Sequence, residues 1–209
     1  QIEDMFDCAE LLARQQTPKG DRLAIITNAG GPGVMTTDAL IARDGEMAKL
    51  TEETINQLNE FLPTCWSHGN PVDVLGDAPP DRFAKAVEIV LKDKQVDAVL
   101  VILTPQAMTN PTAAARAVAE LASRSAKPVL AAWVGGASVR EGLGLLVEAG
   151  VPAYGTPEQA VRAFMTLVRY ARNLDALCET PRDIPVTFTP DREEVRRRLE
   201  TLPPDTGDI

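Results

Sequence analysis

The regular alternation of apolar runs with amphipathic segments is the feature that most constrains the fold of this chain. Two runs, residues 97–104 (DAVLVILT) and 127–134 (KPVLAAWV), are apolar almost throughout, which is typical of strands covered by helices on both faces of a parallel sheet. Further strands are predicted at 22–27, 47–50 and 150–155. Because strands and helices alternate five times, we predict an α/β, flavodoxin-like parallel sheet of order 2-1-3-4-5 with helices on both faces.

The spacing of apolar residues places the helices between these strands. Thr51, followed by Glu52 and Glu53, resembles an N-cap with acidic residues in the first turn. Helices are expected at 33–42, from 51 onward, around 83–91, at 112–123, from just after Gly135-Gly136 to 149, and at 157–174. The longest irregular stretch, residues 63–80, is of the kind that more often has a function than not.

The pattern divides the chain into three parts. Residues 1–20 are expected to form an N-terminal helix (over 2–16) and a linker, and residues 21–177 the α/β domain. Residues 178–209 mix prolines and charges around one short helix at 192–202, so they are interpreted as an extended connector toward another domain.

Charge and composition exclude several classes of partner. The net charge of −9 argues against nucleic acid and anionic membranes, since both are bound through surplus Lys and Arg. No apolar run approaches the roughly 20 residues that span a bilayer, and the acidic start does not resemble a signal peptide, so a cytoplasmic location is expected. With three scattered cysteines and one histidine, no metal site is predicted.

Two loops that follow strands are the best candidates for a binding site. In a sheet of this order, ligands bind beyond the carboxyl ends of the strands where the order reverses, which brings together residues 28–33 (NAGGPG) and 105–111 (PQAMTNP). Both loops precede helices, whose first N–H groups bind anions. Asn28, Thr104, Gln106 and Thr109 could add neutral hydrogen-bond donors, so a phosphoryl group is the expected ligand.

The glycine turn leaves alternative interpretations open. A dinucleotide-binding loop needs Gly-x-Gly-x-x-Gly and an acidic residue about 20 positions on, whereas Gly30-Gly31-Pro32-Gly33 has another spacing and the second strand ends at Leu50-Thr51. No Walker loop is present. The glycines are also compatible with nothing more than a tight turn and close helix–sheet packing.

The irregular stretch contains a second, weaker constellation. His68, the single histidine, lies near Asn70 and Asp73, which makes Asn70 and Asp73 a possible loop site. Asp73 and Asp77 could hold Mg²⁺ or could simply cap and turn the chain. No catalytic residue is predicted, because the chain has no Gly-x-Ser-x-Gly elbow and a triad would have to use His68.

Four stretches in order resemble the NDP-forming acyl-CoA synthetases, the acetate–CoA ligase (ADP-forming) branch of the succinyl-CoA synthetase superfamily. The resemblance runs from about residue 2 to 173. Its motifs are RLAIITNAGGPGVMTTDAL, GNPVDVLGDAPPDRFAKAVEIVLKDKQVDAVLVILTPQAMTNP, KPVLAAWVGG and EAGVPAYGTPEQAVRAFMTLVRYARN. It implies a succinyl-CoA-ligase-like flavodoxin domain, with TFTPDREEVRRRLETL leading toward an ATP-grasp domain.

The resemblance also implies a role. In this family, acid, CoA and ATP become acyl-CoA, ADP and phosphate through a phosphohistidine, which belongs to a motif absent from this chain; His68 does not inherit that role. This chain is then expected to be inactive alone. It would supply a phosphate-facing helix start at residues 104–110, Asn110 included, with Asn28, Gly30, Gly31 and Gly33 beside it.

The implied cofactors and partners lie outside this chain. ATP or ADP, Mg²⁺ and CoA are expected to be used by the parent enzyme, with a small carboxylic acid as substrate and with ATP-grasp and CoA-binding domains as partners. The WSHGNPVD variant is similar to bacterial chains fused to a GNAT acetyltransferase. A non-catalytic, ligand-sensing domain of a protein lysine acetyltransferase is therefore the alternative function.

Overall fold

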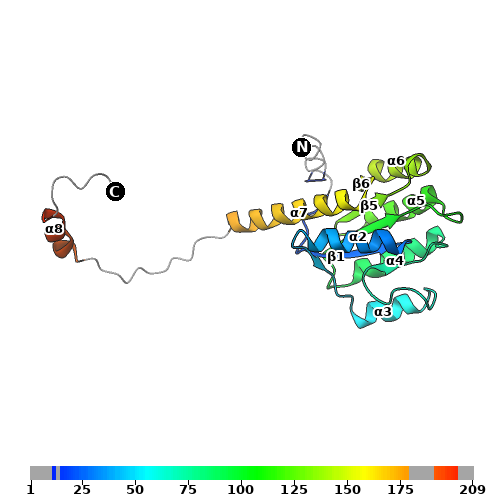
Figure 1. The fold of residues 1–209 in the computed structure, drawn as a ribbon, viewed down its shortest axis with the longest axis horizontal. Coiled ribbons are helices and arrows are strands. Elements are labelled where there is room, and N and C mark those ends of the chain that lie inside the picture. The colour runs from blue at the N-terminus through cyan, green and yellow to red at the C-terminus, as the bar shows by residue number, and fades with distance from the viewer. Residues whose placement is uncertain (1–10, 13–14, 179–190, 202–209) are drawn as a thin grey trace. The chain divides into compact units, whose positions relative to one another are not determined.

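The computed structural model describes residues 11–12, 15–178 and 191–201 (Figure 1). The chain divides into one compact unit, Gln1–Ala176, and a second unit, Leu177–Ile209. In the second unit the described part contains helix α8 (Arg192–Glu200), which has no buried residue. The helix expected at 2–16 lies almost wholly outside the described residues.

The first unit is built on a parallel sheet. Its strands are β1 (Arg22–Thr27), β2 (Glu46–Met47), β3 (Val72–Asp73), β4 (Ala98–Leu103), β5 (Val129–Trp133) and β6 (Ala153–Tyr154). The order is β2-β1-β4-β5-β6, with β3 also paired to β1. The predicted flavodoxin-like order is confirmed, and β3 is a strand that the sequence did not predict.

Helices cover both faces of this sheet (Figure 1). They are α2 (Gly30–Ile41), α3 (Glu52–Asn59), α4 (Pro80–Lys92), α5 (Pro111–Ala122), α6 (Arg140–Glu148), preceded by a 3-10 turn at Gly136–Val139, and α7 (Pro157–Cys178). Side chains of α2 and α7 pack on one face, and those of α3, α4, α5 and α6 on the other. No described helix is both long and apolar enough to cross a membrane.

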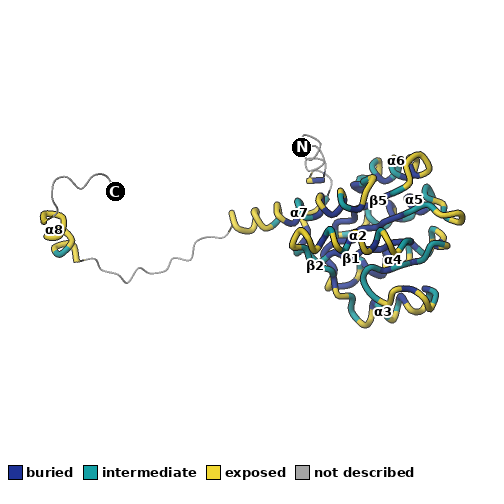
Figure 2. Tube along the Cα trace, viewed as in Figure 1, coloured by how far each residue is buried: buried dark blue, intermediate teal, exposed yellow. Residues whose placement is uncertain are grey.

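Strand β1 shows how the two hydrophobic cores are separated. Leu23 and Ile25 face the core under α2 and α7, whereas Ala24 and Ile26 face the core on the other side. Because successive side chains of a strand point to opposite faces, an uninterrupted apolar run fills both cores. The central strands β1, β4 and β5 accordingly form the buried centre in Figure 2.

Helix α2 begins at Gly30, three residues before the predicted start. Pro32 lies in its first turn, where a missing N–H leaves no intrahelical bond unmade and the fixed φ suits a helix. The glycines therefore form the first turn of the helix itself rather than a loop ahead of it.

One edge of β1 pairs with two short strands in succession. Arg22 and Leu23 pair with β2, and Ile26 and Thr27 pair with β3, while β4 pairs along the other edge. Between the two short strands the ladder would be interrupted.

The side chain of Asn70 fills this interruption. Its Oδ1 accepts a hydrogen bond from the backbone N–H of Ile25 (2.9 Å). Its Nδ2 donates to the carbonyl oxygens of Leu23 (2.8 Å) and Ala48 (3.0 Å). The carboxamide thus replaces a peptide group, which explains why no continuous strand pattern marks this edge in the sequence.

A charged clamp joins the amino ends of β1 and β4. The Arg22 guanidinium donates from Nε to Asp97 Oδ2 (2.8 Å) and from Nη2 to Oδ1 (2.8 Å), and the backbone N–H of Arg22 donates to Oδ2 (3.1 Å). These bonds, chiefly those from the guanidinium, hold the pKa of Asp97 below its ordinary value although burial acts to raise it.

Replacing Asn70 with alanine should destabilise the domain. The change leaves one backbone N–H and two carbonyl groups without their partner, so we expect a loss of about 2–4 kcal/mol in the free energy of unfolding. Urea unfolding followed by circular dichroism measures this loss. Asn173→Ala, at an exposed position of α7, is the control and should change stability by less than about 0.5 kcal/mol. Equal effects of the two variants would contradict the bridging role.

The clamp predicts an acid-dependent loss of stability. Because the pKa of folded Asp97 lies below its unfolded value of about 3.9, its contribution is complete above about pH 4 and is lost as the pH falls through the folded pKa. Asp97→Asn should therefore be less stable than the unmodified chain at pH 7, and the difference should shrink toward pH 3. Asp175→Asn, an exposed acid, is the control; a difference independent of pH in Asp97→Asn would refute the assignment.

Candidate functional site

The carboxyl ends of β1 and β4 are joined by one buried side chain, that of Asn28. Its Oδ1 accepts a hydrogen bond from the backbone N–H of Thr104 (2.9 Å), and its Nδ2 donates to the Thr104 carbonyl oxygen (2.8 Å). Asn28 is only 1% exposed. These two hydrogen bonds hold the carboxyl ends of β1 and β4 next to each other, at the point where the sheet order reverses. The loops at 28–33 and 105–111 therefore begin side by side, as a shared binding site requires.

Gln106 brings the loop after β4 against the end of β1. Its Nε2 donates to the carbonyl oxygen of Asn28 (3.2 Å), and its backbone N–H donates to Thr109 Oγ1 (3.1 Å). The Gln106 carboxamide also lies where Gly76 has no side chain, since a Cβ at Gly76 would be 2.0 Å from Gln106 Oε1. A third segment, the loop between β3 and α4, therefore belongs to the same edge.

The two helix starts at this edge differ in how they are capped. Asn110 caps α5, because its side chain accepts a hydrogen bond from the N–H of Ala113 (3.0 Å). The first N–H groups of any helix have no intrahelical acceptor, and at the start of α2 no side chain of the N-cap residue Ala29 replaces it for Gly30 and Gly31. The start of α2 is consequently the more open of the two for an anion.

The hydroxyl of Thr104 is exceptional. Among the side chains that the structure describes, its Oγ1 is the one buried polar atom without a hydrogen-bond partner. Such atoms are few in folded proteins, and a water molecule or a ligand group can satisfy them. It lies in the residue that Asn28 fixes, between the ends of the two central strands.

Asp73 carries negative charge to the start of α2. It pairs with Thr27 in the sheet, and its Oδ1 accepts a hydrogen bond from the N–H of Leu75 (2.9 Å). A Cβ at Gly30 would lie 3.6 Å from Asp73 Oδ2. Asp77, by contrast, forms an ion pair with Arg82 (2.7 Å). No group of three or more His, Cys, Asp or Glu residues suited to a metal ion occurs in the described part of the chain.

His68 belongs to a separate cluster. Its Nδ1 lies 3.0 Å from Asn59 Oδ1 and its Nε2 lies 3.0 Å from the Thr64 carbonyl oxygen. Its ring is 4.9 Å from that of Trp66, whose indole N–H also donates to Asn59 Oδ1 (2.8 Å). Asn70 serves the sheet ladder, so His68, Asn70 and Asp73 each have different partners and do not form a catalytic constellation.

The structure brings together most of the residues chosen from the sequence. Hydrogen bonds directly link Asn28, Thr104, Gln106 and Thr109. Gly33 instead packs inward, where a Cβ would meet the side chains of Thr27 (3.1 Å) and Pro71 (3.5 Å). Sequence reasoning missed Gly76; its one signal was a glycine in the loop that follows Asp73.

These features define a parallel α/β domain whose switch-point edge presents an uncapped helix start. The chain belongs to the family described as the Ligase-CoA domain, whose profile matches residues 23–178. The family resemblance noted in the sequence is thereby confirmed.

Relatives with known names are similar over most of the chain. It is 38% identical over 201 residues to acetate–CoA ligase (ADP-forming) I of Archaeoglobus fulgidus, covering 96% of this chain and 28% of that protein. It is also 38% identical over 180 residues to the alpha subunit of acetate–CoA ligase (ADP-forming) II of Pyrococcus furiosus, covering 83% of this chain and 38% of the subunit. The chain thus spans well under half the length of these relatives.

A solved structure has the same fold. It is described as the dinucleotide forming acetyl-coenzyme A synthetase 1 of Ca. Korarchaeum cryptofilum in complex with phosphate and ADP. The likeness has a TM-score of 0.79 at 33% sequence identity and covers 86% of this chain and 40% of that one.

Gly76 and Gln106 should be energetically coupled. Gly76→Ala displaces the Gln106 carboxamide from Asn28, whereas in a Gln106→Ala background the added methyl group meets no such obstacle. We expect a coupling of about 1 kcal/mol in a double-mutant cycle, roughly the value of one hydrogen bond. Chemical denaturation of the four proteins measures it. Additive effects would show that the close approach of Gly76 to Gln106 is of no consequence.

Proposed function

We propose that this chain is a domain of an ADP-forming acyl-CoA synthetase, in which acid, CoA and ATP become acyl-CoA, ADP and phosphate through a phosphohistidine. Within that reaction the domain contributes the wall of a phosphate site, not a catalytic acid, base or nucleophile. Residues 21–177 form the contributing domain, and residues 178–209 connect it to an ATP-grasp domain.

The observation that carries this proposal is the uncapped start of α2 at Gly30 and Gly31. The N-terminus of a helix has an effective charge of about +0.5, and its free N–H groups bind phosphate without a basic side chain. Asn28 holds this helix start beside residues 104–110 through its two hydrogen bonds to Thr104. Donors held in place in this way stabilise phosphoryl charge without moving during the reaction.

The sequence relatives give independent support. Two are named as ADP-forming acetate–CoA ligases, and the structural relative is described with phosphate and ADP. We propose that nucleotide, Mg²⁺, CoA and the small carboxylic acid are held by further domains that correspond to the additional length of these relatives. The phosphorylated histidine also belongs to such a domain, since both ring nitrogens of His68 already face hydrogen-bond partners.

The negative charge of Asp73 favours a phosphate position on the side of the α2 start that is away from this carboxylate. Its Oδ2 lies beside Gly30, so a phosphoryl group would be repelled from that flank and favoured toward Gly31 and the loop after β4. The proposed contacts are therefore the N–H groups of Gly30 and Gly31, with Gln106, Thr109 and Asn110 on the opposite wall.

A charge placed at Gly31 tests the site without disturbing the fold. A Cβ at Gly31 meets nothing within 4 Å, and a carboxylate in the first turn favours the helix dipole, so Gly31→Glu should remain folded. We expect it to weaken binding of inorganic phosphate at least about tenfold. Binding is followed from the amide signals of Gly30 and Gln106 by NMR titration.

Gly144→Glu is the matched control, because a Cβ at Gly144 in α6 also meets open space. It should leave phosphate binding unchanged. The placement would be contradicted if phosphate shifted the amide signals of the turn before α6 and left those of residues 28–33 and 104–110 unchanged.

The isolated chain should show no acyl-CoA formation from acid, CoA and ATP. The same assay with the complete polypeptide or assembly should show turnover that Gly31→Glu reduces. Turnover by the isolated chain would refute the assignment of the nucleophile to another domain. Lysine acetylation without thioester formation in the complete protein would favour the regulatory alternative.

A further inference from the structure

A basic cavity lies away from the switch-point edge, between α7 and the turn after α2. It has a volume of about 550 Å³ and is lined by Arg43, Asp44, Arg162, Met165, Val168, Arg169, Arg172 and Asn173. Four arginines but a single acidic residue, Asp44, thus line the cavity in a chain whose net charge is −9. A cavity lined mainly by one sign of charge raises the local concentration of ligands of the opposite sign.

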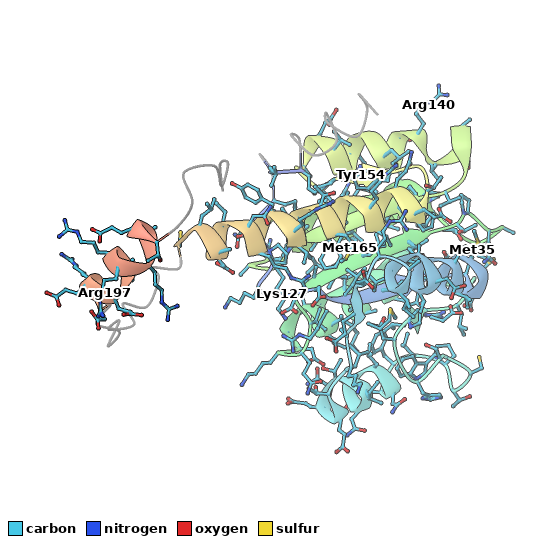
Figure 3. The ribbon with its side chains drawn as sticks, turned by 60° about the vertical axis from the view of Figure 1, so that its left-hand side comes forward. Met35, Lys127, Arg140, Tyr154, Met165 and Arg197 are labelled. Carbon is cyan, nitrogen blue, oxygen red and sulfur yellow. The ribbon has the colours of Figure 1, made fainter. Side chains whose placement is uncertain are left out.

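The sequence of α7 produces this arrangement. Val161, Phe164, Leu167 and Val168 point into the core. Arg162, Met165, Arg169 and Arg172 follow at helical spacings of three and four residues, so they form a stripe along the flank of the same helix. Figure 3 shows Met165 on this flank.

Gly45 allows the turn after α2 to approach α7 closely. A Cβ at Gly45 would lie 2.8 Å from Met165 Sδ and 2.4 Å from Leu40 Cδ1. The Met165 thioether and the buried side chain of Val168 therefore form an apolar floor, while Arg43 stands on the α2 side of the cavity and Arg169 on the α7 side.

Two of the four arginines, Arg43 and Arg172, have identified partners in the described part of the chain. Arg172 pairs with Asp21 (2.8 Å), and Arg43 Nη1 donates to the Ala39 carbonyl oxygen (3.1 Å). Exposed pairs of this kind contribute about 0–1 kcal/mol. Arg162 also has a partner in the fold. Within the described residues Arg43 and Arg169 form no ion pair, so their guanidinium groups remain available to an anionic ligand.

We propose that this cavity is an accessory binding site for a nucleoside polyphosphate. Guanidinium groups bind phosphate oxygens through paired N–H donors and stack on planar rings. The floor of Met165 and Val168 suits one aromatic base, because thioethers contact aromatic rings favourably. The volume lies in the range of about 300–1,000 Å³ typical of small-molecule sites.

This site is separate from the proposed phosphate wall. The cavity adjoins the C-terminal end of α2, whereas Gly30 and Gly31 form its start. Twelve residues of helix place the two ends about 18 Å apart. The inference therefore stands or falls independently of the proposed function.

The test is a titration of the 209-residue chain with ATP, inorganic tripolyphosphate and adenosine, followed by NMR and calorimetry. ATP should bind saturably and shift the signals of Arg43, Met165 and Arg169. Arg169→Glu should weaken ATP binding at least about tenfold, and raising the salt concentration should weaken it further. Arg140→Glu makes the same charge change at the start of α6, away from Met165 in Figure 3, and should have no effect.

Two further comparisons identify the ligand and the place. If ATP shifts the amide signals of Gly30 and Gln106 while those of Arg43, Met165 and Arg169 stay unchanged, ATP binds the switch-point edge and the proposal is wrong. Tripolyphosphate that binds as tightly as ATP would overturn the role of the base. Tighter binding of a polyglutamate peptide than of ATP would show a surface for acidic protein segments instead. No saturable ATP binding would also overturn the proposal.

Discussion

The pairing of β1 with β4 is the contact on which the other features of the domain depend. It is fixed at both ends by side chains: Arg22 and Asp97 join the amino ends, and Asn28 joins β1 to Thr104 at the carboxyl ends. Between these clamps the strands bury apolar side chains on both faces. The register of this pair sets where α2 and the loop after β4 emerge, and therefore where a ligand can meet them.

Much of this fold could be predicted from the sequence because its signals are local. The run at 97–104 has no polar alternation, so it indicated a strand buried on both faces, and the alternation with helices fixed the order of the sheet. Strand β3 could not be predicted in the same way. Its two residues, Val72 and Asp73, lie in a stretch rich in proline and glycine, and the neighbouring ladder bonds come from the Asn70 side chain, which no periodicity reveals.

The candidate site was predictable in position but not in detail. The two loops could be chosen from topology alone. The roles of individual side chains depended on contacts far apart in sequence: Asn28 was expected to offer a donor, yet its carboxamide is committed to the Thr104 backbone. Asn110 caps α5, which leaves α2 as the open helix start. Gly76 mattered only once Gln106 was seen beside it.

The carboxamide of Asn70 also has a consequence for association between molecules. A long edge strand exposes a row of N–H and C=O groups on which another chain can add a strand. Here both margins of the sheet are strands of two residues, β2 and β3 at one side and β6 at the other. With a side chain in place of backbone between β2 and β3, that margin is a poor template for further strands. Addition of a strand from another molecule at either edge of the sheet is therefore unfavourable. Contacts with other domains are expected to use the helices and loops instead.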